Sequence, residues 1–140
     1  GESIDVDGRR FYRITGYDAM PPFFMTVLGA SDLWLFISST GGLTAGRGVA
    51  DQALFPYTTE DKVTRSAGRT RGPVVWQPFE PVRPGDPETR RSLSKDELGT
   101  TLVFEETRPD LGLTFAVTWR TSGRFGVVRT CELTADDGAA

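Results

Sequence analysis

The side chains best suited to binding a ligand are concentrated in one irregular stretch, Gly41 to Lys62. This stretch interleaves aromatic rings with side chains that form planar hydrogen bonds, a composition that suits carbohydrate or another polar ligand. The candidate ligand-binding residues are Arg47, Asp51, Tyr57, Asp61 and Lys62, together with Trp76 further along the chain. The structural alternative is that Arg47 pairs with Asp51 while Phe55 fills the core.

A glycine-rich segment, Ser39 to Gly48, follows an apolar run and raises the question of phosphate binding. A P-loop requires Gly-Lys-Ser/Thr after its spacer, whereas Arg47 and Gly48 follow Gly46 here. The dinucleotide-binding pattern fails as well, because no three glycines have its spacing. We therefore expect no nucleotide cofactor.

The absence of histidine and the positions of the paired acidic residues indicate whether the chain could be a catalyst by itself. It contains no histidine, which removes the usual general base and the usual zinc ligand. Glu105 and Glu106 are adjacent in an expected strand, so their side chains point to opposite faces and are expected to solubilise a sheet edge. Asp136 and Asp137 lie in the C-terminal tail. We therefore predict no catalytic residues, no metal site and no cofactor in this chain.

The three tryptophans and the single cysteine have structural interpretations. Trp34 and Trp119 are expected in the core, whereas Trp76 is the ring most open to stacking on a sugar. Cys131 lies among apolar neighbours and is predicted to be a small core residue. With one cysteine the chain cannot form an intramolecular disulfide.

Short apolar runs separated by turns predict an all-β fold. Residues 11–15, 23–28 and 33–39 are expected strands, and the last two form a hairpin. Both strands of that hairpin are apolar on successive residues, which predicts that each is covered on both faces. Residues 40–71 follow as a long irregular loop region.

The C-terminal third predicts a three-strand meander at residues 101–107, 113–121 and 125–133. Its middle strand alternates, with apolar side chains on one face; these are Leu113, Phe115, Val117 and Trp119. No β-α alternation is present, so we predict one antiparallel β-sandwich domain over residues 1–140, with a closed barrel as the alternative. Between 86 and 99, the start pattern Asp86-Pro87-Glu88 predicts either a surface helix ending at Gly99 or a loop.

Several motifs resemble a known group of proteins. They are Leu35-Phe36-Ile37-Ser38-Ser39, Gly41-Gly42-Leu43-Thr44-Ala45-Gly46-Arg47, Asp51-Gln52-Ala53-Leu54-Phe55-Pro56-Tyr57, Asp61-Lys62 and Arg124-Phe125-Gly126-Val127-Val128-Arg129. Over most of its length the chain resembles the N-terminal region of large bacterial proteins similar to cellobiose phosphorylases and related glycoside hydrolases. The resemblance implies a non-catalytic β-sandwich that packs on a following (α/α)₆ barrel and shapes the rim of a sugar site. Catalysis in such enzymes belongs to the barrel, so the resemblance transfers no catalytic residue to this sequence.

Charge and hydropathy narrow the choice of partners. The chain is acidic, with a net charge of −3 and a pI of about 5.0, and its sequence shows no obvious basic patch. We therefore expect no nucleic-acid partner. The longest apolar run, Leu33 to Ile37, is far too short to cross a bilayer, so we expect no membrane partner. No signal segment opens the chain, and we expect a cytoplasmic protein. Gly1 in place of Met suggests a piece of a larger polypeptide.

Three functions are compatible with these observations. The first is an accessory domain of a carbohydrate-active enzyme, whose partner is the rest of a larger polypeptide or a homo-oligomer. It predicts an exposed apolar patch where the barrel docks. The second is a free-standing carbohydrate-binding or protein-interaction module, which would be a monomer with a complete core. The third is a small enzyme without histidine, which would need convergent carboxylates with perturbed pKa values.

Overall fold

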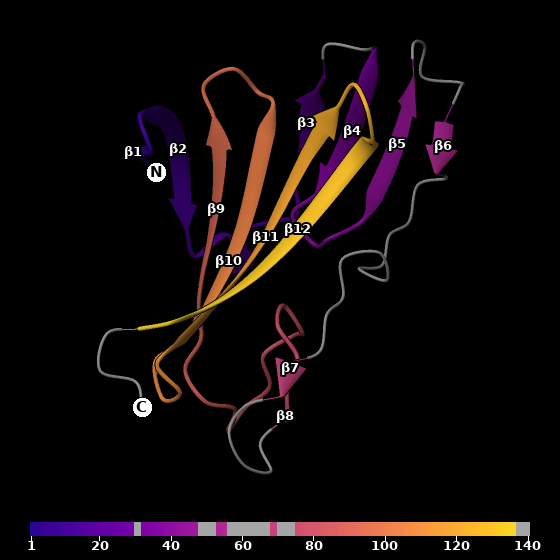
Figure 1. Ribbon diagram of the computed structural model, residues 1–140. Helices are drawn as coiled ribbons and strands as arrows, with labels where there is room; N and C mark the ends of the chain where they lie inside the picture. The colour runs from indigo at the N-terminus through magenta and orange to yellow at the C-terminus, as the bar shows by residue number, and fades with distance from the viewer. Residues whose placement is uncertain (30–31, 48–52, 56–67, 70–74, 137–140) are drawn as a thin grey trace.

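The computed structural model describes residues 1–29, 32–47, 53–55, 68–69 and 75–136 of the 140-residue chain (Figure 1). The large sheet contains β1 (Glu2–Val6), β2 (Arg9–Thr15), β9 (Arg90–Asp96), β10 (Thr101–Arg108), β11 (Leu113–Ser122) and β12 (Gly126–Ala135). The small sheet contains β3 (Phe24–Leu28), β4 (Leu33–Ser38), β5 (Leu43–Arg47) and β6 (Ala53–Phe55). A short 3₁₀ helix, η1 (Tyr17–Ala19), precedes the small sheet, and a ribbon pairs β7 (Gly68–Arg69) with β8 (Val75–Trp76).

The large sheet is antiparallel and runs in the order β1-β2-β9-β10-β11-β12. A two-residue turn at Asp7 and Gly8 joins β1 to β2, and both residues have the positive φ that a type I′ turn requires. β2 then pairs with β9, with Phe11 opposite Asp96. The chain between these two neighbours leaves the large sheet, forms the small sheet and the ribbon, and returns at β9.

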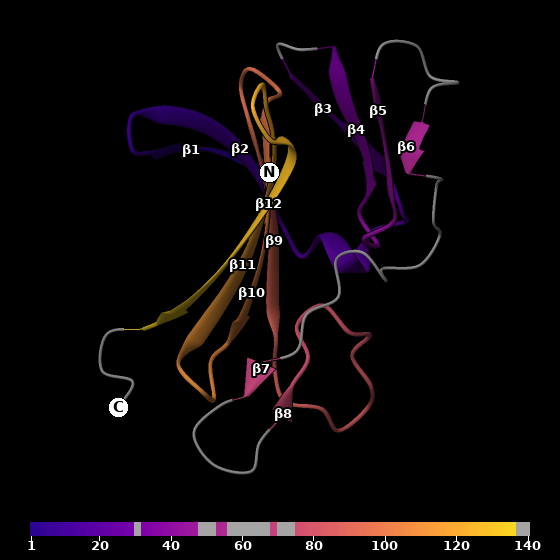
Figure 2. The same ribbon diagram turned by 45° about the vertical axis from the view of Figure 1, so that its right-hand side comes forward.

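The small sheet, in the order β3-β4-β5-β6, packs against one face of the large sheet (Figure 2). β3 contacts β11, and β4 contacts β12. The two sheets approach closely at Gly29, where a Cβ atom would lie 2.1 Å from Thr121 Oγ1, so a larger residue would clash with the Thr121 side chain. The prediction of an antiparallel β-sandwich is confirmed.

The core lies between the two sheets and comes from alternate positions of their strands. In β11, Val117 and Trp119 are buried and Phe115 packs against them. The buried core residues are Tyr17, Val27, Leu35, Ile37, Leu43, Ala45, Leu93, Leu102, Phe104, Val117 and Trp119. The C-terminal meander and the alternation of its middle strand are therefore confirmed.

The prediction of a helix or loop over residues 86–99 is wrong for Arg90–Asp96. These residues form β9, a central strand between β2 and β10. Leu93 is buried in the core directly opposite Phe104 of β10. Pairing with two neighbouring strands outweighs the local helix-start pattern, as tertiary context commonly does.

β3 and β4 form the predicted hairpin, but the prediction that both are covered on both faces is wrong. β3 is an edge strand of the small sheet. In β4, Leu35 and Ile37 are buried, whereas Phe36 between them is 40% exposed on the opposite face. A two-layer sandwich gives each sheet one buried face, so the apolar residues of the other face stay partly in water.

Two further core predictions are wrong. Cys131 is exposed, because β12 forms a margin of the large sheet and its apolar neighbours do not enclose the thiol. Trp34 is half-buried on the face of β4 that points away from the core, opposite Leu28 of β3. Side chains alternate along a strand, so a core position for Leu35 excludes one for Trp34.

Candidate functional site

A buried ion pair between Glu106 and Arg91 anchors the candidate site at one end of the large sheet. The two residues lie opposite each other on β10 and β9, and Arg91 Nε donates to Glu106 Oε2 at 2.7 Å. Phe79 N donates to the same oxygen at 2.8 Å, and Trp76 Nε1 donates to Oε1 at 2.7 Å. The carboxylate is 1% exposed, and these three donors meet the condition under which a charge can stay buried.

Arg91 extends this network to two other segments. One of its terminal nitrogens donates to the carbonyl oxygen of Glu80, and the other lies 3.8 Å from Asp18 Oδ2 in η1. Tyr17, beside Asp18, is buried and packs edge-on against Phe104. Burial raises the pKa of Tyr17 well above its usual range, although Arg91 acts in the opposite direction, so its phenol stays neutral.

Next to this network lies a cavity of about 560 Å³, which we call the loop cavity. It opens between residues 77–89 and the large sheet, and the residues lining it include Trp76, Gln77, Arg83, Asp86, Arg91 and Arg108. Arg108 is held in place by two hydrogen bonds of 2.8 Å to the carboxylate of Asp110. Hydrogen bonding to Arg108 is the main reason that the pKa of Asp110 lies below its usual range.

The lining of the loop cavity includes many polar and charged side chains. Guanidinium, carboxylate and amide groups surround it, and such groups suit a ligand rich in hydroxyls. Both oxygens of Glu106 already accept hydrogen bonds, so this carboxylate holds the wall of the cavity in place. Within the described part of the chain, no three His, Cys, Asp or Glu side chains are placed to hold a metal ion.

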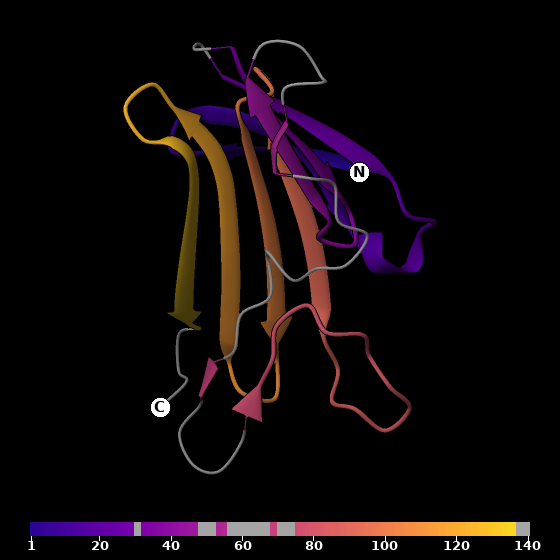
Figure 3. The ribbon, with the colours of Figure 1, turned by 90° about the vertical axis from the view of Figure 1, so that its right-hand side faces the viewer.

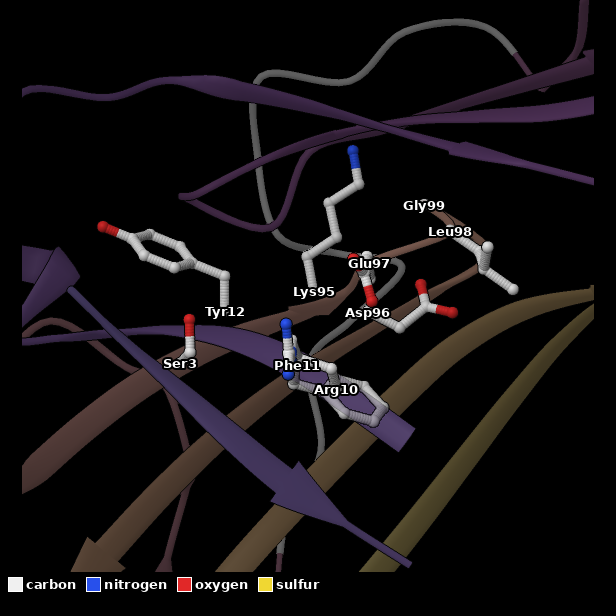
Figure 4. A pocket seen from close by; sticks show the side chains of 9 residues that line it. All are labelled: Ser3, Arg10, Phe11, Tyr12, Lys95, Asp96, Glu97, Leu98 and Gly99. Atoms are coloured by element: carbon white, nitrogen blue, oxygen red, sulfur yellow. The ribbon is translucent and has the colours of Figure 1, made fainter. Parts of the chain in front are cut away.

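A second cavity, of about 570 Å³, lies at the other end of the large sheet, over β1, β2 and the turn after β9 (Figure 4). Tyr12 and Lys95 face each other across the ladder here. Figure 4 shows the Lys95 ammonium pointing away from the sheet and the Tyr12 hydroxyl pointing in a different direction. These two groups do not converge on one point, and we call the second cavity the shelf.

Asp96 stabilises the turn beside this shelf. Its Oδ1 accepts hydrogen bonds from the backbone N–H groups of Thr100 and Thr101 at 2.7 and 2.8 Å. Its Oδ2 accepts from Arg9 Nη2 and from Thr100 Oγ1, both at 2.6 Å. Burial by itself raises the pKa of Asp96, but these hydrogen bonds together outweigh burial and hold the pKa below its usual value.

The protein is expected to lose stability as the pH falls below the ordinary aspartate pKa of 3.8. The pKa of Asp96 is lower in the folded than in the unfolded chain, so the stabilisation present at neutral pH is lost as the pH falls through the folded pKa. At neutral pH, Asp96→Asn should lower the free energy of unfolding by about 1–3 kcal/mol. Thermal unfolding across the acid range should show this difference shrinking, and a constant difference would contradict the assignment.

The face of the small sheet that points away from the large sheet carries four large apolar side chains. We call these four the outer apolar face: Phe24, Leu28, Trp34 and Phe36, which the β3–β4 register places on one side together with Thr26 and Ser38. Phe24 and Leu28 are 50% and 55% exposed, and the rings of Phe24 and Phe36 stack with centroids 5.2 Å apart. Apolar surface gathered in this way on a folded domain is typical of a contact with another protein.

The structure describes only part of the predicted ligand-binding set. Trp76 lines the loop cavity, but it is 3% exposed and its N–H is bonded to Glu106, so its ring offers no open platform. Arg47 is the last residue of β5, opposite Leu33, and its side chain lies outside the described part. Four more predicted residues lie wholly outside the described ranges: Asp51, Tyr57, Asp61 and Lys62. Their role in binding stays a prediction.

Sequence reasoning missed the pairing of Glu106 with Arg91. The sequence predicts that Glu106 lies at a sheet edge in water, which is wrong, because β10 is a central strand. Its separation from Glu105 is confirmed, since Glu105 lies on the other face and pairs with Arg13 at 3.4 Å. A signal does exist in the sequence, because alternation along β10 places Glu106 on the same face as Phe104.

No family model matches this chain, and a search of curated proteins finds no match either. Neither comparison assigns the chain to a family, so its resemblance to cellobiose phosphorylases and related glycoside hydrolases stays a hypothesis. In the described ranges no helix is both long and apolar enough to cross a membrane.

Proposed function

We propose that this chain is a non-catalytic β-sandwich accessory domain of a carbohydrate-active enzyme, and that its outer apolar face docks on the catalytic barrel. The observation that carries the proposal is the exposed, stacked pair of Phe24 and Phe36, with Leu28 and Trp34 beside it. A parent enzyme with a docked barrel is the partner that the sequence resemblance suggests, and such a partner requires an apolar patch on this domain.

Docking at the outer apolar face is favourable because it removes hydrocarbon from water. Full burial of a large apolar side chain contributes about 1.5–3 kcal/mol, and three residues of this face are roughly half exposed before docking. Aromatic residues at the centre of a contact are also what protein interfaces favour.

We propose further that this domain contacts sugar at the rim of the parent active site. The loop cavity supports this second part of the proposal. Gln77, Arg83 and Asp86 present donors and acceptors that suit hydroxyl groups, and the Glu106–Arg91 pair keeps the opposite wall rigid. Catalysis is assigned to the barrel. We also propose a cytoplasmic location; the single cysteine allows no intramolecular disulfide, so the fold does not require an oxidising compartment.

The test compares the isolated chain with the native protein, captured from its source extract by an antibody to this domain. The native mass is expected to be several times 15.3 kDa. Hydroxyl-radical footprinting should then oxidise Phe36 and Leu28 in the isolated chain and leave them protected in the native protein. Phe125, which is 71% exposed in the β11–β12 turn, is the control and should be oxidised in both samples.

Two outcomes would contradict this proposal. A native mass near 15.3 kDa would favour a free-standing carbohydrate-binding or protein-interaction module instead. A large native protein in which Phe36 is oxidised as readily as in the isolated chain would retain the larger polypeptide but remove the outer apolar face as its docking surface.

A further inference from the structure

Strand β12 forms one margin of the large sheet, where its partner in the described structure is β11 (Figure 3). It is ten residues long, and its residues from Thr130 to Ala135 are all exposed. Natural edge strands usually carry charged side chains, proline or a bulge that prevents pairing with another chain. β12 has no lysine, proline or bulge, and its two charged residues, Arg129 and Glu132, have opposite signs. The strand at the other margin, β1, has five residues, two of which are acidic.

The backbone groups of alternate β12 residues point away from β11. Asp136 N, just after the strand, donates to Gly112 O at 2.7 Å, so this residue bonds toward β11. The register continues without a shift along the whole β11–β12 pair, and in an antiparallel pair every second residue bonds to the same neighbour. The N–H and C=O groups of Cys131 and Leu133 therefore point outward and can bond to an added strand.

We propose that this added strand is β12 of a second copy of the chain, paired antiparallel so that two large sheets join into one. Residues directly opposite each other in such a pair share a face, so a symmetric register places one residue opposite itself. Like charges opposite each other are destabilising, which excludes registers centred on Arg129 or Glu132. A register centred nearer either end of β12 pairs fewer residues of the two strands. Only the registers centred on Thr130 and on Cys131 both avoid like charges at the centre and pair most of the strand.

Cross-strand contacts favour the register centred on Cys131. It places Glu132 opposite Thr130 of the second copy, where the hydroxyl can donate to the carboxylate. It also places Arg129, whose guanidinium lies over the Trp119 ring, opposite Leu133, and the aliphatic part of the arginine can contact this 52% exposed side chain. The register centred on Thr130 would instead place the Glu132 charge opposite Val128. The dimer therefore has Cys131 on its two-fold axis.

This dimer is expected to be weak. Backbone hydrogen bonds supply the affinity in strand addition, and the side chains select the register. A contact one strand wide falls below the roughly 1,000 Å² that stable protein interfaces bury. We therefore expect the dimer to be populated at chain concentrations on the order of 100 µM and above.

Two substitutions of opposite charge at Leu133 test the register. Leu133→Lys faces Arg129 of the second copy and should weaken dimerisation about tenfold, whereas Leu133→Glu faces the same arginine and should strengthen it. Leu98→Lys is the control, because Leu98 is also exposed but lies in the β9–β10 turn. Sedimentation equilibrium measures the dissociation constants, and circular dichroism establishes that each variant is folded.

Disulfide formation at Cys131 gives an independent readout. Directly opposite, hydrogen-bonded residues have Cα atoms about 5.5 Å apart, within the roughly 4.4–6.8 Å that a disulfide spans. Their Cβ atoms are about 5.5 Å apart, beyond the roughly 4.5 Å upper limit for a disulfide, so the bond requires a small shift of the two strands toward each other. Diamide accepts the two electrons and two protons that a pair of thiols gives up. It should convert the wild-type chain to a covalent dimer and leave Leu133→Lys largely monomeric.

A monomer at every concentration would overturn the proposal, and so would equal effects of Leu133→Lys and Leu133→Glu. A dimer that Phe36→Ser dissociates while Leu133→Lys leaves it intact would also overturn it, because the contact would then lie at the outer apolar face. The proposed docking function does not depend on β12, so its footprinting test stands or fails separately.

Discussion

Replacing Glu106 with alanine is expected to lower the free energy of unfolding by about 3–5 kcal/mol. The substitution removes the acceptor for Trp76, Phe79 and Arg91 at once. The buried Arg91 guanidinium then loses its 2.7 Å carboxylate partner and keeps the 3.8 Å contact with Asp18 and the hydrogen bond to Glu80 O, and a buried charge that loses its main partner is among the most destabilising changes a single substitution makes. Urea unfolding followed by circular dichroism measures the loss.

Glu105 offers a matched control, because it is the next residue along the same strand. Its pair with Arg13 is partly exposed, so Glu105→Ala should lower the free energy of unfolding by about 0–1 kcal/mol. The double variant Glu106→Leu with Arg91→Leu removes both buried charges and should be more stable than Glu106→Ala alone. If Glu105→Ala and Glu106→Ala had the same small effect, the buried pair would not be what anchors the loop cavity.

Leu35→Ala is expected to lower the free energy of unfolding by about 2–5 kcal/mol. Leu35 is fully buried between the two sheets, so truncation leaves a cavity that the surrounding core fills only in part. Its neighbour Phe36 lies on the outer apolar face, and Phe36→Ala should therefore have the smaller effect, about 1 kcal/mol or less. Urea unfolding of the two variants compares the two faces of one strand.

This comparison also separates folding from docking. If the Phe36→Ala variant is folded and stable, the exposed ring of Phe36 is not needed to stabilise this domain. This is the result expected for a residue of a docking surface. If Phe36→Ala were as destabilising as Leu35→Ala, the outer apolar face would belong to the core of this domain, and the proposed contact with a barrel would lose its support.

The C-terminal half of the fold could be predicted because its pairing is local. β10, β11 and β12 follow one another through short turns, so each strand pairs with the next one in the sequence. The alternation of Val117 and Trp119 with polar residues then fixes which face is buried. The β3–β4 hairpin could be predicted for the same reason.

The remaining features depend on pairing between distant segments. β9 lacks a strong strand pattern of its own, and its place between β2 and β10 decides its conformation. Glu106 and Arg91 lie opposite each other only in that register. The residue types in the sequence therefore indicate the loop after Gly41 as the binding site and do not indicate this pair. The exposure of Phe36 likewise follows from having one small sheet on one large sheet, which single-strand patterns do not show.

The neighbouring positions of β2 and β9 also set the order in which the chain can assemble. The hydrogen bond between Arg13 and Ser94 spans 81 positions, so the first hairpin of the chain has no sheet to join until β9 has been synthesised. At cellular rates of translation this interval is roughly 4–16 s. Closing such a long loop is unfavourable in entropy and slows folding. On the ribosome, the β1–β2 hairpin therefore waits with an unpaired edge, and this is the stage at which mispairing with other chains is easiest.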